Sequence, residues 1–244
     1  MDSSPKKVLV ICDHPELYGK FVELIGELGV DENIFVFVTT EIENIEITRG
    51  SLALLENLDP DFLASQFGII LSLHCRKILP PNLVKKIKCI NIHPGFNPYN
   101  RGWYPHVFSL VNGLPAGATL HEMDEEIDHG PIIDQIKVEI YPTDTSKTLY
   151  ERIQMAEIEL LRKNLRSILE NNYTTFLPHE EGNVNYKKDF ENLCQLDFNN
   201  GISFDDFFSR LRALTHPPYK NAYFIDKKSG KKIFVYIDIE DNQL

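Results

Sequence analysis

The sequence has few cysteines, and their spacing excludes several classes of site. Cys12, Cys75, Cys89 and Cys194 are the only four in 244 residues, and no two form the C-x-x-C pair of zinc or redox motifs. Three of them lie in apolar, strand-like runs, which predicts buried, reduced thiols. No histidine and cysteine spacing is typical of a metal site either, so we expect no metal.

The chain also lacks long apolar runs and an excess of basic residues. No apolar run approaches membrane-spanning length, and the first five residues are polar and unlike a signal peptide. We therefore expect a cytoplasmic protein without a membrane partner. The net charge of −11 is the opposite of a nucleic-acid surface, so no nucleic acid partner is expected. A small anionic substrate in a locally basic pocket is still compatible with this charge.

The residues that are present predict an α/β fold. At 43% hydrophobic residues, 244 residues can bury one sizeable core with a small appendage. Apolar runs that alternate with helical patterns predict a Rossmann-like fold with a mainly parallel sheet. No G-x-G-x-x-G follows the first strand, which disfavours a nicotinamide site. The expected strands are 7–12, 33–38, 67–73 and 88–93, and the expected helices are 14–29, 51–58 and 80–87.

The rest of the chain predicts further elements and a smaller C-terminal region. The segment 145–171 has the clearest helical stripe, and Thr148 with Glu151 has capping-box spacing. A polar linker at 172–185 divides a catalytic domain, 1–175, from a small helix and hairpin region, 186–244. The other expected elements are a helix at 102–113, a strand pair at 117–123 and 131–141, a helix at 203–214 and a C-terminal hairpin.

Two polar side chains stand at the end of the apolar strand 88–93. Asn91 and His93 are two residues apart, so they point to the same face, at the edge where parallel sheets bind ligands. The imidazole can act as a general base and the amide can donate to an oxyanion. Asp128 lies in a loop between two predicted strands and is the candidate to orient His93. No serine or cysteine nucleophile is adjacent, so we expect the substrate itself to attack a carbonyl.

Structural roles for these three residues compete with this catalytic hypothesis. A histidine at a strand end, an asparagine that satisfies loop backbone and an aspartate that caps a turn are all common. His121 and His129 flank Asp128, but nothing marks the further ligands that zinc would need. The residues alone leave both interpretations open.

The segment "CINIHPGFNPYNRGWYPHVFSLVNGLPAGATLHEMDEEIDHGPIIDQ" resembles the catalytic core of the formyltransferases that use N10-formyltetrahydrofolate. The shared pattern is Asn-x-His at a strand end, a proline after it, and a distal Asp-x-Gly loop. Here these are Asn91, His93, Pro94 and the loop from Asp128 to Gly130. The resemblance covers roughly residues 6 to 140. It implies that His93 is the general base, Asn91 the oxyanion donor and Asp128 the orienting carboxylate.

Within this family, three further stretches resemble the sugar N-formyltransferases rather than the tRNA and purine branches. They are "NPYNRGW", "HCRKILP" and "LTHPPYKNAYF". The resemblance implies a dTDP-linked amino-dideoxysugar as acceptor, with the amine at C-3 or C-4, for surface polysaccharide such as the O-antigen of lipopolysaccharide. It also implies a homodimer. A short, acidic tail argues against tRNA.

The resemblance also implies two sets of binding residues. The folate would lie near the loop after the third long strand and the loop before Asp128. The sugar nucleotide would contact the "NRGW" stretch and the C-terminal "YKN" stretch. Two prolines stiffen the loop before Tyr219, so that the tyrosine ring can stack on a base. The first set is Arg76, Lys77, Ile78, Leu79, Met123 and Ile127, and the second is Asn100, Arg101, Gly102, Trp103, Tyr219, Lys220 and Asn221.

Two other functions remain open at this point. The same three residues could direct water at the formyl group and make a formyltetrahydrofolate hydrolase, which needs no acceptor pocket. The chain could instead be a non-catalytic nucleotide-sugar binding module, against which the intact Asn91, His93 and Asp128 set argues.

Overall fold

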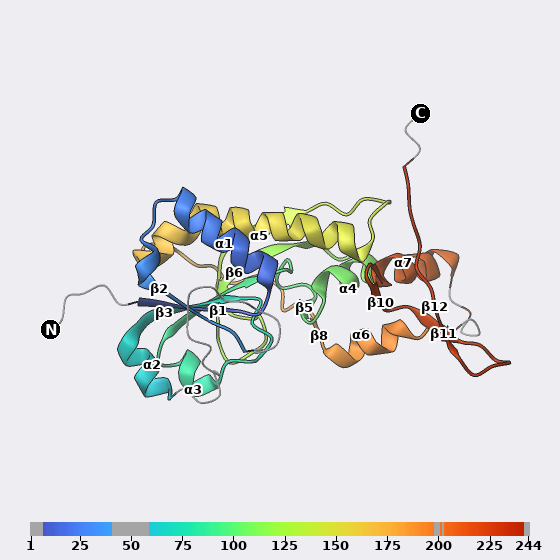
Figure 1. Cartoon of the computed structure of the whole chain (residues 1–244), viewed down its shortest axis with the longest axis horizontal. Helices are drawn as coiled ribbons and strands as arrows, with labels where there is room; N and C mark the ends of the chain where they lie inside the picture. The colour runs from blue at the N-terminus through green and yellow to red at the C-terminus, as the bar shows by residue number, and fades with distance from the viewer. Residues whose placement is uncertain (1–6, 41–58, 198–200, 202, 242–244) are drawn as a thin grey trace. The chain divides into compact units, whose positions relative to one another are not determined.

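The structure, a computed structural model, describes residues 7–40, 59–197, 201 and 203–241 (Figure 1). The helix expected at 51–58 lies outside these residues. The chain forms two compact units, each made of several segments. The first is Met1–His93, Thr119–Ile136 and Glu157–His179, and the second is Pro94–Ala118, Lys137–Ala156 and Glu180–Leu244. The division into 1–175 and 186–244 follows chain order and stays a prediction.

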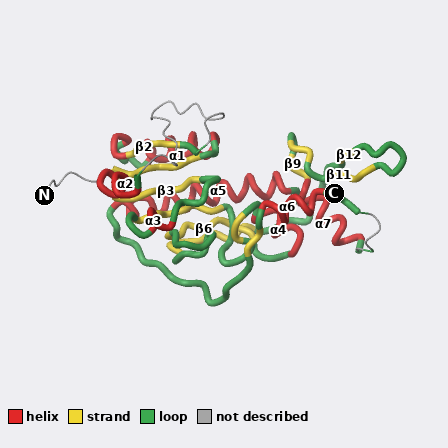
Figure 2. Tube along the Cα trace, turned by 90° about the horizontal axis from the view of Figure 1, so that it is seen from below, coloured by secondary structure: helices red, strands yellow, loops and turns green. Residues whose placement is uncertain are grey.

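A six-stranded sheet with the order β2-β1-β3-β4-β6-β7 organises the first unit. Its first four strands are parallel, and β6 is antiparallel to β4, which confirms the mainly parallel α/β fold. The labels of Figure 2 show β2, β3 and β6 in this order, and β1 and β4 lie between them in the sheet. The strands are β1 (Lys7–Cys12), β2 (Phe35–Val38), β3 (Phe67–Leu73), β4 (Lys88–His93), β6 (Ala116–Glu122) and β7 (Ile132–Val138).

Helices cover both faces of this sheet. Figure 1 shows α1 (Pro15–Glu27) on one face, and α2 (Pro60–Gln66) and α3 (Pro81–Val84) on the other. The helix α1 ends where Gly29 adopts a left-handed φ of 61°, which favours glycine. Its buried residues are Leu17, Phe21, Leu24 and Ile25, four of the five apolar residues expected to form its buried stripe, and the fifth, Leu28, is half-buried.

Some boundaries differ from the expected ones for local reasons. The helix expected at 102–113 begins only at Pro105, as α4 (Pro105–Asn112), because Tyr104 before it is left-handed. The strand expected at 33–38 opens with a short 3-10 turn, η1 (Glu32–Ile34). The helices α2 and α6 (Lys187–Cys194) had no counterpart in the sequence-based expectations.

The second unit holds short strands and the C-terminal helix, α7 (Phe204–Leu214), as expected. Its small core contains Leu196, Leu211, Leu214 and Ala222. The strands pair as β5 (Arg101–Gly102) with β8 (Val184–Asn185), β9 (Thr215–His216) with β10 (Tyr219–Lys220), and β11 (Tyr223–Ile225) with β12 (Lys232–Phe234). Of the helices that the structure describes, none is long and apolar enough to cross a membrane.

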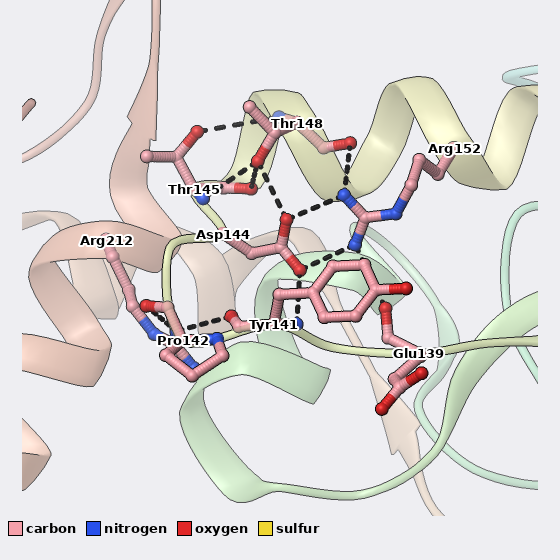
Figure 3. Close-up of polar contacts among 8 residues, drawn as sticks. All are labelled: Glu139, Tyr141, Pro142, Asp144, Thr145, Thr148, Arg152 and Arg212. Atoms are coloured by element: carbon pink, nitrogen blue, oxygen red, sulfur yellow. Dashed lines mark hydrogen bonds and ion pairs between the residues drawn. The ribbon is translucent and has the colours of Figure 1, made fainter. Parts of the chain in front are cut away.

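The helix α5 (Ser146–Leu169) begins at a buried carboxylate in the second unit (Figure 3). Asp144 is 2% exposed, and both of its oxygens accept from the Arg152 guanidinium, at 2.7 and 2.6 Å. The Tyr141 N–H and the Thr148 hydroxyl also donate to it. Thr148 therefore interacts with residues before the helix, and the expected capping box with Glu151 is wrong.

Arg212 on α7 binds the same loop, which precedes α5. Its guanidinium donates to the carbonyl oxygens of Tyr141 and Pro142, at 3.1 and 2.9 Å (Figure 3). The loop that Asp144 and Arg152 hold in shape is thus also a docking point for the C-terminal helix. We expect this ion pair to matter more for stability than an exposed pair, because its carboxylate has no access to water.

The hydrogen bonds to Asp144 make its stabilising effect depend on pH. Burial opposes ionisation, but the donors from Arg152, Tyr141 and Thr148 outweigh it, so the pKa of Asp144 lies below its usual value. The stabilisation is therefore present above the pKa of the unfolded chain, about 3.9. It is lost as the pH falls through the lower pKa of the folded protein.

We predict that Asp144→Asn lowers the free energy of unfolding by about 3 kcal/mol at pH 7, because it breaks a pair whose carboxylate is buried. The difference from the wild type should shrink as the pH falls below about 4, because Asp144 then binds a proton in the unfolded chain before it does so in the folded protein. The matched control is Glu151→Gln, which removes an exposed pair with Lys147 at 3.9 Å and should cost under about 0.5 kcal/mol. Denaturant unfolding at several pH values measures both, and equal costs for the two variants would contradict the prediction.

Candidate active site

The strands β4 and β6 bring four polar side chains to one face of the sheet. Asn91 lies opposite His121, and His93 lies opposite Thr119, in the antiparallel register of these strands. Side chains of directly opposed residues point to the same face. All four are buried, at 8% exposure or less.

Asp128 joins Asn91 and His93. One of its carboxylate oxygens accepts from the Asn91 amide at 3.1 Å, and the other lies 3.3 Å from Nδ1 of His93. Its backbone is left-handed, with a φ of 47°, a conformation that aspartate tolerates better than most residues. The three residues that the sequence singled out for chemistry are therefore together in the first unit.

Gly130 lets the Asp128 loop fold back onto β6. The Glu122 N–H donates to the Pro131 carbonyl oxygen at 2.9 Å, which brings the two backbones together. A Cβ at Gly130 would lie 2.0 Å from the Glu122 carbonyl oxygen, so only glycine fits here. The glycine of the Asp-x-Gly pattern therefore has a steric reason.

His121 also belongs to this cluster, although its place in the sequence suggested only a metal ligand. Its Nε2 lies 3.3 Å from the Asn91 amide nitrogen and 3.6 Å from an oxygen of Asp128. It occupies the same face as Thr119, two residues earlier on β6. The alternation of faces along the strand indicated that His121 and Thr119 share a face. It could place His121 beside Asn91 only if the pairing of β6 with β4 were known.

The geometry suits proton transfer beside a carbonyl. Because Nδ1 of His93 faces Asp128, the carboxylate can orient the ring and stabilise the imidazolium, while Nε2 is the ring nitrogen directed elsewhere. The Asn91 amide is a hydrogen-bond donor beside that ring. Among the described residues, no group of three or more histidine, cysteine or acidic side chains could hold a metal ion.

The cysteines offer no nucleophile in this region. Burial raises the pKa values of Cys12, Cys75 and Cys89 to about 12, so these residues are thiols at neutral pH. Each of the four cysteines is free of disulfides. Cys12 and Cys89 are buried as expected, whereas Cys75 and Cys194 are half-buried.

A second buried carboxylate, Asp13, fastens the loop after β3. Its oxygens accept from the Arg76 N–H at 2.8 Å and from the Thr39 and Thr40 hydroxyls at 2.7 and 2.5 Å. Burial opposes ionisation, but these donors and the Thr40 N–H outweigh it and hold the pKa of Asp13 below its usual value. The carboxylate thereby joins three loops at the carboxyl edge of the parallel strands. In the sequence, the only indication of this role is that Asp13 is a charged residue directly after a buried strand.

A contact between a histidine and a carboxylate holds the same loop at a second point. Nε2 of His74 lies 2.6 Å from a carboxylate oxygen of Glu157, which is fully buried. The ring of His14 contacts that of His74 edge-on, at 5.4 Å between centroids. Burial, His74, Arg76 and Lys20 lower the pKa of His14 to about 4, so this ring is neutral at pH 7.

The six residues expected to contact folate differ in their surroundings. Arg76 and Ile78 are exposed, and Lys77 and Ile127 are half-buried. The Leu79 side chain is buried in the core below the loop, and Met123 packs against the same core cluster. The two basic side chains and Ile78 are thus the ones that the loop presents to solvent.

Asn100 lies inside the second unit. Its side chain is 0% exposed and donates to Ser109 and Asn112, while its oxygen accepts from Asn112, Asn183 and Asn185. These bonds use both hydrogens of the Asn100 amide and direct three donors at its oxygen. The structure therefore gives Asn100 a structural role at the β5–β8 junction.

The remaining residues expected to contact the sugar nucleotide also belong to the second unit. Arg101 is buried, and Gly102 is where β5 approaches β8 so closely that a Cβ would lie 2.4 Å from the Asn185 carbonyl oxygen. Trp103 is half-buried, with the Lys187 ammonium 5.8 Å from its ring. Tyr219 and Lys220 are exposed, and the Asn221 amide donates to the Leu214 carbonyl oxygen.

Comparison with known proteins identifies close relatives. Residues 3–165 match the family described as formyl transferase, and residues 189–241 match an N-formyltransferase dimerization C-terminal domain. A dTDP-4-amino-4,6-dideoxyglucose formyltransferase of Mycobacterium tuberculosis is 45% identical over 178 residues, 73% of this chain and 76% of the relative.

Two solved structures are also similar over nearly their whole length. A 4-N formyltransferase from Francisella tularensis has a TM-score of 0.87 at 38% identity, covering 97% of this chain and 99% of that one. A sugar N-formyltransferase from Shewanella has a TM-score of 0.90 at 33% identity, covering 98% and 99%.

We predict that Gly130→Ala destabilises the protein by about 1–3 kcal/mol, because the new Cβ must push the Asp128 loop away from Glu122. The control is Gly19→Ala in α1, where a Cβ would meet nothing within 4 Å. That change should leave stability equal or raise it by up to about 1 kcal/mol. Denaturant unfolding measures both, and a Gly130→Ala protein as stable as the wild type would refute the steric argument.

Proposed function

Because the chain belongs to the formyl transferase family, we propose that it transfers a formyl group from N10-formyltetrahydrofolate to the amine of a dTDP-linked amino-dideoxysugar. The observation that carries the chemistry is the contact of Asp128 with both Asn91 and His93. The named acceptor of the mycobacterial relative makes dTDP-4-amino-4,6-dideoxyglucose the first acceptor to test. Its 3-amino isomer is the second.

In this proposal, His93 accepts the proton that leaves the sugar amine as the amine nitrogen bonds to the formyl carbon. Asn91 donates a hydrogen bond to the oxyanion that forms on the formyl oxygen. Asp128 stabilises the His93 imidazolium during this step. His93 then returns the proton to N10 as the bond from N10 to the formyl carbon breaks. The products are the formamido sugar and tetrahydrofolate, so atoms and charges balance.

The folate contacts that we propose involve the loop after β3 and the loop before Asp128. The exposed Arg76 and half-buried Lys77 supply positive charge in an acidic chain, and Ile78 supplies an apolar surface that is 76% exposed. Ile127 precedes Asp128 directly. Leu79 and Met123 would support this surface from the core below it.

The sugar-nucleotide contacts that we propose come from Arg101, Trp103, Tyr219 and Lys220. Tyr219 is 69% exposed, and its ring is 5.7 Å from that of His216, which Ser146 contacts at 2.9 Å. An exposed ring that another side chain supports from one side is suited to stack on a base. In this proposal Asn100, Gly102 and Asn221 shape the surrounding backbone.

We also propose a homodimer, since residues 189–241 match a dimerization domain. The hairpin β11–β12 exposes Ile225, Ile233 and Phe234, each at least 40%, which is an apolar surface suited to a second copy. The use of the product in surface polysaccharide and a cytoplasmic location stay predictions from the sequence.

One assay separates the proposal from its rivals. Formyl-folate consumption is followed with and without the dTDP-amino sugar. A transferase consumes it only with the sugar, a hydrolase consumes it equally without, and a binding module consumes none. Consumption independent of the sugar would therefore overturn the proposed acceptor, and no consumption in either case would overturn the proposed activity.

We predict that His93→Asn lowers kcat at least ~10²-fold, because the amine loses its proton acceptor. Substrate binding, measured by calorimetry, should persist. A variant with turnover near that of the wild type would remove His93 from the mechanism.

We predict that Tyr219→Ala raises the KM for the dTDP-sugar about 5- to 100-fold, from a stacking energy of about 1–3 kcal/mol, and leaves the folate KM unchanged. The control is Phe204→Ala, which removes another exposed ring of the second unit and should change neither KM. If Tyr219→Ala also leaves both values unchanged, the ring does not bind the nucleotide.

A further inference from the structure

The amide of Asn91 is held from two sides. Its nitrogen donates to Asp128 at 3.1 Å and lies 3.3 Å from Nε2 of His121. The opposite orientation would place the amide oxygen against a carboxylate oxygen, which repels it. The contact with Asp128 therefore decides which way the amide points, and the second amide hydrogen is directed to His121.

The protonation of His121 follows from its other nitrogen. Nδ1 lies 2.7 Å from the Glu122 carbonyl oxygen, which can only accept, so Nδ1 carries a hydrogen. With that hydrogen on Nδ1, Nε2 is the ring nitrogen that can accept, and it faces the Asn91 amide at 3.3 Å. The ring is 1% exposed, so water does not compete for this contact.

We propose that His121 is a positioning residue that aims the Asn91 amide for formyl transfer, an inference that rests on the function proposed above. Asp128 holds one amide hydrogen tightly. The other is held by the longer contact with Nε2 of His121, an imidazole nitrogen, which is weaker than a bond to a carboxylate. That hydrogen is the one that a developing oxyanion can attract. His121 thus keeps the Asn91 amide oriented before the reaction without competing with the oxyanion that forms during it.

Two substitutions separate the two contacts of His121. In His121→Gln, the terminal amide reaches the place of Nε2 and can still accept from Asn91. In His121→Asn, the shorter side chain can still donate to the Glu122 carbonyl oxygen but does not reach Asn91. Both variants are polar and keep the buried site filled, so both are suited to fold.

The expected result is a difference in kcat. His121→Asn should lower kcat about 10- to 100-fold, the usual effect of a misplaced catalytic group, with both KM values within about twofold. His121→Gln should stay within about fivefold of the wild type. The control, His179→Asn, changes an exposed histidine and should have no effect. Equal losses for Gln and Asn, or no loss for either, would overturn the proposal.

A double-mutant cycle tests whether His121 acts through Asn91. If it does, His121→Asn should cost little further kcat once Asn91 is alanine, because the group that it orients is gone. A full, additive loss in the Asn91→Ala background would show that His121 acts by another route.

A spectroscopic readout keeps this proposal separate from the proposed function. The side-chain amide signals of Asn91, assigned by their loss in Asn91→Ala, should show two hydrogen-bonded protons in the wild type. In His121→Asn one of them should exchange faster with water and shift, while in His121→Gln both stay protected. Unchanged signals in His121→Asn would overturn the positioning role. If the wild type transfers no formyl group but the signals change as expected, the proposed function fails and the contact stands.

Discussion

The Asp128 carboxylate is the interaction on which the candidate active site depends. This one group accepts a hydrogen bond from the Asn91 amide on β4 and faces the imidazole of His93, two residues further along the same strand. Both partners lie on a sheet, which is rigid, whereas Asp128 lies on a loop. The loop is placed by close backbone approach at Gly130, so a glycine with no polar group helps to determine the geometry of the polar cluster.

Buried carboxylates have the same role elsewhere in this acidic chain. Asp13 joins three loops at the carboxyl edge of the sheet, and Asp144 organises the loop before α5. In both cases several donors converge on one ionised group, and in both the pKa is lowered despite burial. A carboxylate accepts up to about four hydrogen bonds, so one residue can hold irregular backbone that has no sheet or helix partner.

Much of the fold and the central residues of the site could be predicted from the sequence. The buried strands read as continuous apolar runs, and Lys7–Cys12, Phe67–Leu73 and Lys88–His93 have the expected bounds. Asn91 and His93 were visible because two polar residues interrupt such a run at its end. The helix α6 was not visible, because its surroundings are polar and it buries none of its side chains completely.

By itself, the sequence determined the residue types, their alternation on strands and the order of elements, since these depend on neighbours within a few positions. Tertiary structure alone decided that His121 lies opposite Asn91 and that Asn100 is saturated by partners up to 85 residues away. It also decided that Arg152 serves the loop at Asp144. The physical reason is that strand register and loop closure bring together side chains whose separation along the chain carries no local signal.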